Sequence, residues 1–286
     1  MTKAIEDPIS RALQLSEKIP GKSEVKRRSR TDFSGRPAKS TSTLIHNNNV
    51  IELDVDLLTA NRLLVDPQTD DGVTADRYRL LNTRIRQRMA PRDWRKLGIT
   101  SPAPREGKSL TSLNLAITAS RESSEPVILI DVDTRRPSIC SYLGVTPNAS
   151  LGDYLEGKAK LSEVVFSSPT YPGLHIIGNV PGTSRRVLTK DRLNELFEEI
   201  AKEDASVVVD LPPVLVGDDV LLVSPHTDAM LIVLRDEQSN LDDLKTTTDL
   251  LGEFNLLGTI LNCSKEVGRS MKGYYYSHKG GQSTNV

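Results

Sequence analysis

From residue 97 onward, short apolar runs alternate with segments of helical length, and this alternation constrains the fold more than any other feature. Six runs have the character of buried strands, namely residues 97–100, 127–130, 174–177, 207–209, 230–234 and 256–261. Helix-length segments lie between them, including residues 109–121, 190–202 and 239–253. Strands that alternate with helices form parallel sheets covered on both faces. We therefore expect an α/β fold with a doubly wound, mostly parallel sheet and helices on both faces.

The rest of the chain differs from this core in composition. The first part is rich in Lys, Arg, Ser and Thr, most densely at residues 26–30, and is expected to be a disordered basic arm. It is either a solvated tether or a docking site for anionic lipid or another protein. Apolar residues at helical spacing between Ala75 and Met89 predict an amphipathic helix. The expected regions are an arm (1–49), a lead-in segment (50–96), a P-loop domain (97–264) and a flexible tail (265–286).

Overall charge and cysteine content exclude several classes of protein. The formal net charge of -1 gives no general reason to expect a nucleic-acid partner. The two cysteines, Cys140 and Cys263, are too far apart in sequence for a redox or metal pair, which favours a reducing cytosol. No stretch reaches the roughly 18 apolar residues that a membrane span needs. We expect a cytoplasmic chain.

A Gly-Lys-Ser sequence follows the first expected strand and leads directly into an expected helix. In this context backbone N–H groups and the helix N-terminus surround phosphates, Lys108 contacts their oxygens and the Ser109 hydroxyl ligates Mg²⁺. Pro102 stands where the common P-loop pattern has glycine, and it removes one donor N–H. The alternative is a coincidental Gly-Lys-Ser at a helix start. The residues expected to bind nucleotide are Pro104, Arg105, Glu106, Gly107, Lys108, Ser109 and Leu110.

Carboxylates follow two other expected strands. Asp131 and Asp133 come after residues 127–130, and Asp210 comes after residues 207–209. A lone aspartate in such a place is usually a turn or cap residue. Two acidic strand ends beside a phosphate loop instead favour a site for Mg²⁺, which prefers hard oxygen ligands. The sequence therefore predicts MgATP binding where three strand ends meet.

These residues resemble the bacterial tyrosine kinases of capsule and exopolysaccharide systems, within the deviant P-loop group that includes partition and cell-division ATPases. The resemblance spans about residues 50 to 276. Its most specific parts are Thr100–Ser109, Asn114–Ala116, Ile130–Pro137, Leu151–Gly157 and Asp210–Val214. Members of the family often carry Pro or Ala where Pro102 stands.

The resemblance implies a role for each site residue. Lys108 contacts the phosphates, and Asp131 accepts the proton of the attacking tyrosine, which is mostly protonated at neutral pH. The Mg²⁺ ligands, direct or through water, are implied to be Ser109, Asp133 and Asp210. Asn262 matches a position that reads the adenine edge in this wider group. The implied phosphoacceptors are the consecutive tail residues Tyr274, Tyr275 and Tyr276.

Two departures from the family pattern stand out. The family's oligomerisation element, Glu-x-x-Arg-x-x-Arg, is matched only in part, because the chain has Asp76, Arg79 and Asn82 at those positions. Asp76 and Arg79 are nevertheless expected to form an ion pair between subunits. Arg105 occupies a place where the family often has glycine, which narrows the freedom of the loop backbone.

The resemblance implies an ATP-dependent tyrosine autokinase that regulates polymerisation and export of a polysaccharide. It also implies a membrane adaptor of the chain-length-determinant (polysaccharide co-polymerase) type, recruitment to the inner face of the plasma membrane, self-association and a cognate tyrosine phosphatase. One alternative is a nucleotide-switch ATPase without kinase activity. The other is a positioning or partition ATPase, although Ala103 replaces the signature lysine of those relatives.

Overall fold

The computed structural model describes residues 49–65, 72–182 and 188–264. Most of the expected basic arm and the whole tyrosine-containing tail fall outside these ranges. The predictions for Tyr274, Tyr275 and Tyr276 therefore concern residues that the structure does not describe.

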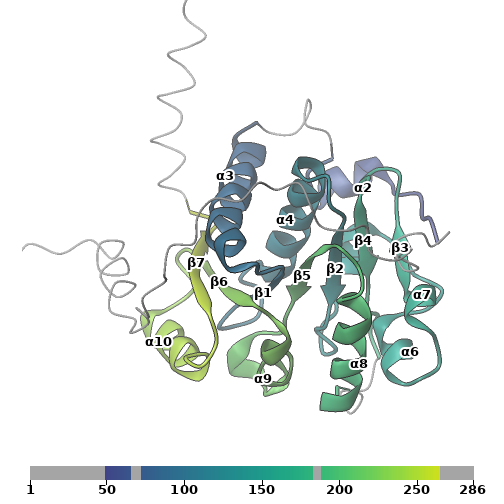
Figure 1. The fold of residues 1–286 in the computed structure, drawn as a ribbon. Helices are drawn as coiled ribbons and strands as arrows, with labels where there is room; N and C mark the ends of the chain where they lie inside the picture. The colour runs from purple at the N-terminus through teal and green to yellow at the C-terminus, as the bar shows by residue number, and fades with distance from the viewer. Residues whose placement is uncertain (1–48, 66–71, 183–187, 265–286) are drawn as a thin grey trace, which may run out of the picture. The chain divides into compact units, whose positions relative to one another are not determined.

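Within the described residues, seven strands form one sheet with the order β3-β4-β2-β5-β1-β6-β7 (Figure 1). Their bounds are β1 Lys96–Thr100, β2 Val127–Asp131, β3 Val165–Ser167, β4 Leu174–Ile177, β5 Ser206–Asp210, β6 Ala229–Arg235 and β7 Leu256–Asn262. All neighbouring pairs are parallel except β3 and β4, which are antiparallel. The predicted doubly wound, mostly parallel sheet is confirmed. The short edge strand β3 was not predicted.

Helices cover both faces of the sheet (Figure 1). The helices of one face are α2 Val55–Ala60, α3 Gly72–Met89, α4 Lys108–Glu122 and α5 Ile139–Leu143. Those of the other are α6 Leu151–Leu155, α7 Leu161–Val164, α8 Lys190–Ile200, α9 Asp219–Val223 and α10 Leu241–Leu250. Three 3₁₀ turns among the described residues, η1 Ala90–Arg92, η3 Val214–Val216 and η4 Ser224–His226, complete the connections.

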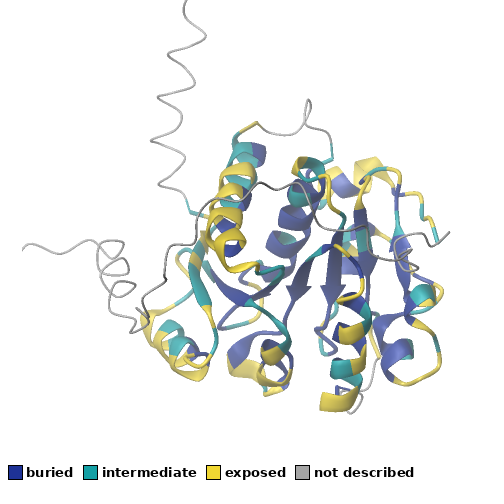
Figure 2. Cartoon of the chain, in the orientation of Figure 1, coloured by how far each residue is buried: buried dark blue, intermediate teal, exposed yellow. Residues whose placement is uncertain are grey.

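Successive residues of the central strands point into two apolar layers. In β2, Ile128 and Ile130 join the layer under α6 and α8, whereas Val127 and Leu129 join the layer under α3 and α4. This alternation is the two-residue period of a strand that is buried on both faces. Figure 2 shows the central strands almost entirely buried, the edge strand β7 partly exposed and the helices exposed on their outer sides. The sheet is therefore a rigid support for the loops at its carboxyl edge.

The lead-in segment is fixed to helix α4 by a buried asparagine. Asn114 Oδ1 accepts the Leu64 N–H at 2.9 Å, and Asn114 Nδ2 donates to the Arg62 carbonyl at 3.1 Å. Leu58 and Leu64 are buried in the same apolar layer as α4. The segment before α3 thus packs directly on the helix that follows the phosphate loop.

None of the helices in the described ranges is both long enough and apolar enough to span a membrane.

Candidate active site

Three neighbouring parallel strands end side by side, which brings the predicted site residues to one edge of the sheet. β5 lies between β2 and β1, and Asp210 is in register with Asp131 on one side and with Ile99 on the other. The loop after β1 leads into α4 at Lys108. Because carboxyl ends of parallel strands share an edge, the Gly-Lys-Ser loop lies beside both acidic strand ends.

Lys108 lies at the centre of a buried charge cluster. Its Nζ is 2.9 Å from Asp133 Oδ2 and 3.5 Å from Asp210 Oδ2, and it also donates to Ser109 Oγ at 3.1 Å. Burial by itself would lower the pKa of Lys108, but the negative charges of Asp210, Asp133 and Asp131 outweigh burial and raise it. The ammonium is therefore kept protonated in a place where phosphate oxygens could replace its carboxylate partners.

Asp131 lies beneath this cluster and is fully buried. One of its oxygens accepts the Asp133 N–H at 3.1 Å, and the other accepts the Ser138 and Ile139 N–H groups at 2.9 and 3.0 Å. Burial and the nearby Asp210 charge raise the pKa of Asp131 to about 7. Asp131 therefore shapes the loop that carries Asp133 and can also exchange a proton near neutral pH. Burial likewise raises the pKa of Asp210, against the effect of Lys108.

A cavity of about 440 Å³ opens above the cluster. Of its lining residues, the sequence predicted Pro104, Arg105, Gly107, Lys108, Ser109 and Asp133. Sequence reasoning missed Arg135, Arg136, Ser138, Tyr142, Pro213 and Val216, although most of them lie in or beside the segments that carry the resemblance. Four lining side chains are cationic and one is a carboxylate, which is a suitable balance for an anionic ligand.

Arg135 joins two walls of the cavity. Its Nε donates to Asp219 Oδ2 at 2.9 Å, and its Nη1 donates to the Val216 carbonyl at 2.8 Å. Its guanidinium lies so close to Gly217 that a Cβ at that position would be 1.8 Å from Arg135 Nη2. The loop after β2 and the loop after β5 are thereby held together.

The phosphate loop contains two residues with positive φ. Arg105 has φ +69°, a left-handed conformation that is uncommon for residues other than glycine. Gly107 has φ +95°, and a Cβ there would be only 2.0 Å from Asn262 Nδ2. Glycine at position 107 is therefore required both by conformation and by space.

Three other residues predicted to bind nucleotide, Glu106, Leu110 and Asn262, lie outside the cavity lining. The Glu106 side chain is buried, and its carboxylate accepts the Ala103 N–H at 2.9 Å and the Ser239 hydroxyl. Asn262 donates to the Glu106 carbonyl at 3.0 Å and accepts the Cys263 N–H at 2.8 Å. In this structure the Asn262 amide supports the loop, and its predicted contact with adenine stays a prediction.

Comparison with known proteins finds similarity to bacterial tyrosine kinases. No protein-family profile matches the chain. It is 28% identical over 211 residues to the tyrosine-protein kinase ptk of Acinetobacter johnsonii, an alignment that covers 72% of this chain and 28% of that protein. It is 26% identical to the tyrosine-protein kinase YwqD of Bacillus subtilis, over 71% of this chain and 87% of that one. The kinase domain of the Escherichia coli tyrosine kinase ETK superposes with a TM-score of 0.63 at 28% identity, covering 76% of this chain and 82% of that domain. Over most of its described core, the chain is therefore similar to the kinase domains of bacterial tyrosine kinases. It spans less than a third of the length of the Acinetobacter kinase.

The residues that resemble the family's oligomerisation element, Asp76, Arg79 and Asn82, lie in the first half of α3. Arg79 Nη1 is 2.9 Å from Asp76 Oδ1 of the same helix, so the two residues form an ion pair within one chain. Asn82, where the family has arginine, is buried and donates to Glu122 Oε2 at 2.6 Å. The third position of the element therefore packs against α4 rather than facing solvent.

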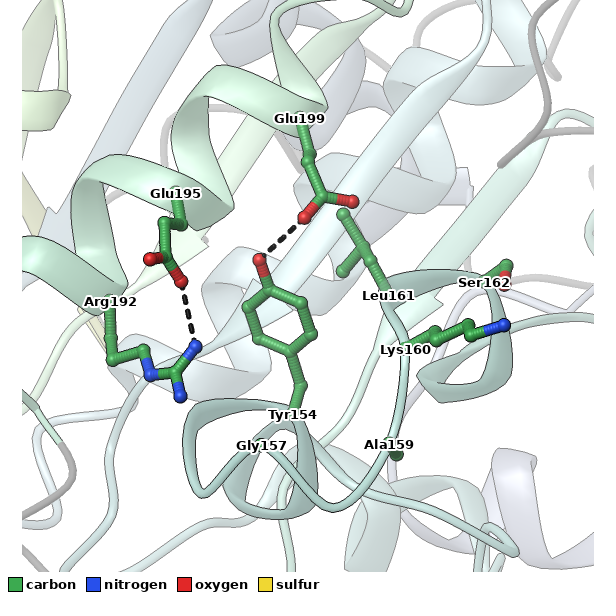
Figure 3. Close-up of a pocket in the computed structure, with 9 residues that line it drawn as sticks. All are labelled: Tyr154, Gly157, Ala159, Lys160, Leu161, Ser162, Arg192, Glu195 and Glu199. Carbon is green, nitrogen blue, oxygen red and sulfur yellow. Dashed lines mark hydrogen bonds and ion pairs between the residues drawn. The ribbon is translucent and has the colours of Figure 1, made fainter.

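A second cavity, of about 390 Å³, lies between α6, α8 and the start of α7 (Figure 3). There the Tyr154 hydroxyl donates to Glu199 at 2.8 Å, and Arg192 pairs with Glu195 at 2.8 Å. Burial and the bond to Glu199 raise the pKa of Tyr154. Because its acidic and basic groups neutralise one another, this cavity lacks the cationic excess expected of the kinase family's phosphate site.

Proposed function

We propose that this chain is an ATP-dependent protein-tyrosine autokinase that phosphorylates Tyr274, Tyr275 and Tyr276 and regulates polymerisation and export of an exopolysaccharide or capsule. The observation that carries the proposal is the buried cluster of Lys108 with Asp133 and Asp210 at the base of a cationic cavity. The names of the relatives support tyrosine as the acceptor.

The donor set suits MgATP. At the start of α4, the N–H groups of residues 108–110 precede the first backbone bond of the helix, from Thr111 to Gly107, and can bind phosphate oxygens. Ser109, Asp133 and Asp210 offer hard oxygens for Mg²⁺. Among the described residues, no three His, Cys, Asp or Glu side chains form a closed metal cage. A metal that keeps several waters and shares its ligands with phosphate fits this arrangement.

In the proposed reaction, Lys108 exchanges its carboxylate partners for phosphate oxygens and stabilises the charge that develops during transfer. When bound, Mg²⁺ neutralises charge on the β- and γ-phosphate oxygens. The phenol oxygen forms a bond to the γ-phosphorus as the bond to the bridging oxygen of ADP breaks. Arg135 keeps the opposite cavity wall in place through Val216 and Asp219.

The phenol must also lose its proton to a carboxylate. Asp131 is the proposed acceptor, because its pKa of about 7 lets it take up and release a proton under physiological conditions. Asp133 is the alternative, because it lines the cavity whereas Asp131 is enclosed. Variants of the two aspartates distinguish these assignments, as described below.

Several further roles belong to the same proposal. ATP and Mg²⁺ are the proposed cofactors, and a chain-length-determinant adaptor is the proposed membrane partner, which would recruit the chain to the inner face of the plasma membrane. We also propose self-association through α3 and dephosphorylation by a tyrosine phosphatase. The division into arm, lead-in segment, P-loop domain and tail is retained as part of the proposal.

Phosphopeptide mass spectrometry after incubation with MgATP tests the kinase assignment. We expect phosphate on the tail tyrosines of the wild-type chain, incubated with and without its adaptor, and none in Lys108→Met. Because this substitution leaves buried Asp133 and Asp210 without their cation, its folding must be verified by circular dichroism. A wild-type chain that binds MgATP but forms no phosphotyrosine in either condition would contradict the proposal and favour a nucleotide switch.

A further inference from the structure

Glu106 forms a connection on the side of the phosphate loop that faces away from the cavity. Glu106 is only 4% exposed, although it lies in a loop at the edge of the sheet. One carboxylate oxygen accepts the Ala103 N–H at 2.9 Å, which closes the loop on itself, and the other accepts the Ser239 hydroxyl. The side chain therefore links the loop to a segment 133 residues later in the chain.

Ser239 is fixed in the orientation that this connection needs. It lies in the turn between β6 and α10, where its Oγ accepts the Arg235 N–H at 2.8 Å. With that bond made, the hydroxyl proton is directed toward Glu106. Arg235 Nη1 also donates to the Arg105 carbonyl at 3.1 Å, and Asn262 donates to the Glu106 carbonyl. Side chains at or just after the ends of β6 and β7 thus hold the Arg105 carbonyl and both the carbonyl and the carboxylate of Glu106.

The loop has a physical need for such support. Arg105 occupies a left-handed conformation that an L-residue adopts at a free-energy cost, and such conformations persist only where surrounding contacts impose them. A hydrogen bond to a buried carboxylate is among the stronger contacts available. Residues 103–107 are therefore held in shape by side chains of this chain rather than by additional glycines.

We propose that Glu106 is a positioning residue, and that its clasp with Ser239 holds the phosphate loop in the conformation that binds nucleotide. This inference rests on the proposed nucleotide site but not on tyrosine as the acceptor. Glu106 acts through the loop backbone and does not contact the phosphates. Loss of the clasp weakens nucleotide binding because the loop must then be ordered at the expense of binding free energy.

The test compares Ser239→Ala, which removes the hydroxyl, with Ser239→Thr, which keeps it. Ser124→Ala is the matched control, since Ser124 is an exposed serine in the loop after α4. Isothermal titration calorimetry with MgADP on the full chain measures affinity, and thermal unfolding without nucleotide measures stability. Autophosphorylation at varied ATP concentration gives KM and kcat separately.

We expect Ser239→Ala to raise the MgADP Kd and the KM for ATP roughly tenfold, the order of effect for a lost bond to a charged group. The kcat at saturating ATP should change much less, and Ser239→Thr should restore the affinity. The proposal would be contradicted by an unchanged Kd in Ser239→Ala, whether or not the melting temperature of that variant falls. If Ser239→Ala weakens MgADP binding and Ser239→Thr restores it, but no variant forms phosphotyrosine, the role of Glu106 is supported and the kinase assignment is contradicted.

Discussion

At the scale of single residues, the active site depends on how charge is distributed in a buried volume. Lys108 keeps its proton because Asp210, Asp133 and Asp131 surround it, and Asp131 gains a pKa of about 7 because burial and Asp210 both disfavour its charge. The residue types and their strand-end positions could be predicted from the sequence. The difference between an enclosed Asp131 and a cavity-lining Asp133 could not, because backbone N–H groups of the following loop bind both carboxylates and only the path of that loop leaves Asp133 at the cavity.

The pH dependence of phosphate transfer should identify the proton acceptor. If Asp131 takes the proton of the phenol, the wild-type rate falls as pH drops below about 7, because the carboxylate becomes protonated. Asp131→Asn should remove that pH dependence and lower kcat by about 10²-fold or more. The measurement is single-turnover transfer to the tail from pH 5.5 to 8.5. If Asp133→Asn abolishes the fall in rate at low pH and Asp131→Asn does not, and both variants still bind MgADP, then the base is Asp133.

At the scale of elements, the apolar pattern predicted six parallel strands, because the central ones are buried on both faces and have no alternating polar residues, and because β7 is apolar although partly exposed. β3 escaped prediction because it is three residues long and pairs only at the sheet edge. The short helices α5, α6, α7 and α9 were also missed, since each has at most five residues and too few turns to show a period. α3 was predicted from its spacing, but the inward direction of Asn82 emerged only from its packing on α4.

Asn82 should contribute to the attachment of α3 to α4. The residue is 3% exposed and its amide donates to Glu122, so Asn82→Ala removes a bond to a carboxylate and leaves a small void. We expect a loss of about 1–3 kcal/mol in the free energy of unfolding, measured by urea denaturation. Thr83→Ala, next along the helix and exposed, is the control and should change little. Equal stability of the two variants would show that α3 does not depend on this bond.

At the scale of the whole chain, contacts distant in sequence determine the shape of the site. The phosphate loop is held by Arg235, Ser239 and Asn262. The two walls of the cavity are joined by the ion pair of Arg135 with Asp219. Sequence reasoning finds the loop because its motif is local. It cannot find these supports, because nothing in a serine of one turn indicates a bond to a glutamate more than a hundred residues earlier.

Self-association through α3 is a prediction at the same scale. The Asp76–Arg79 pair is partly exposed, and exposed pairs of this kind contribute little to stability. Arg79→Ala should therefore leave the melting temperature nearly unchanged but lower the mass observed by sedimentation if the element joins subunits. Arg84→Ala, an exposed arginine on the same helix, is the matched control. A mass that falls equally in both variants would indicate a general effect of charge, and an unchanged mass in Arg79→Ala would exclude the element.

The contact between Arg135 and Gly217 also restricts how the sequences of related chains can diverge. Gly217 has φ 177°, which any residue adopts, so only the guanidinium pressed against it excludes a side chain. The two positions, 82 residues apart in sequence, should therefore covary among relatives. Chains that keep the arginine should keep the glycine, and chains with a shorter residue at the first position should be free to carry alanine or serine at the second.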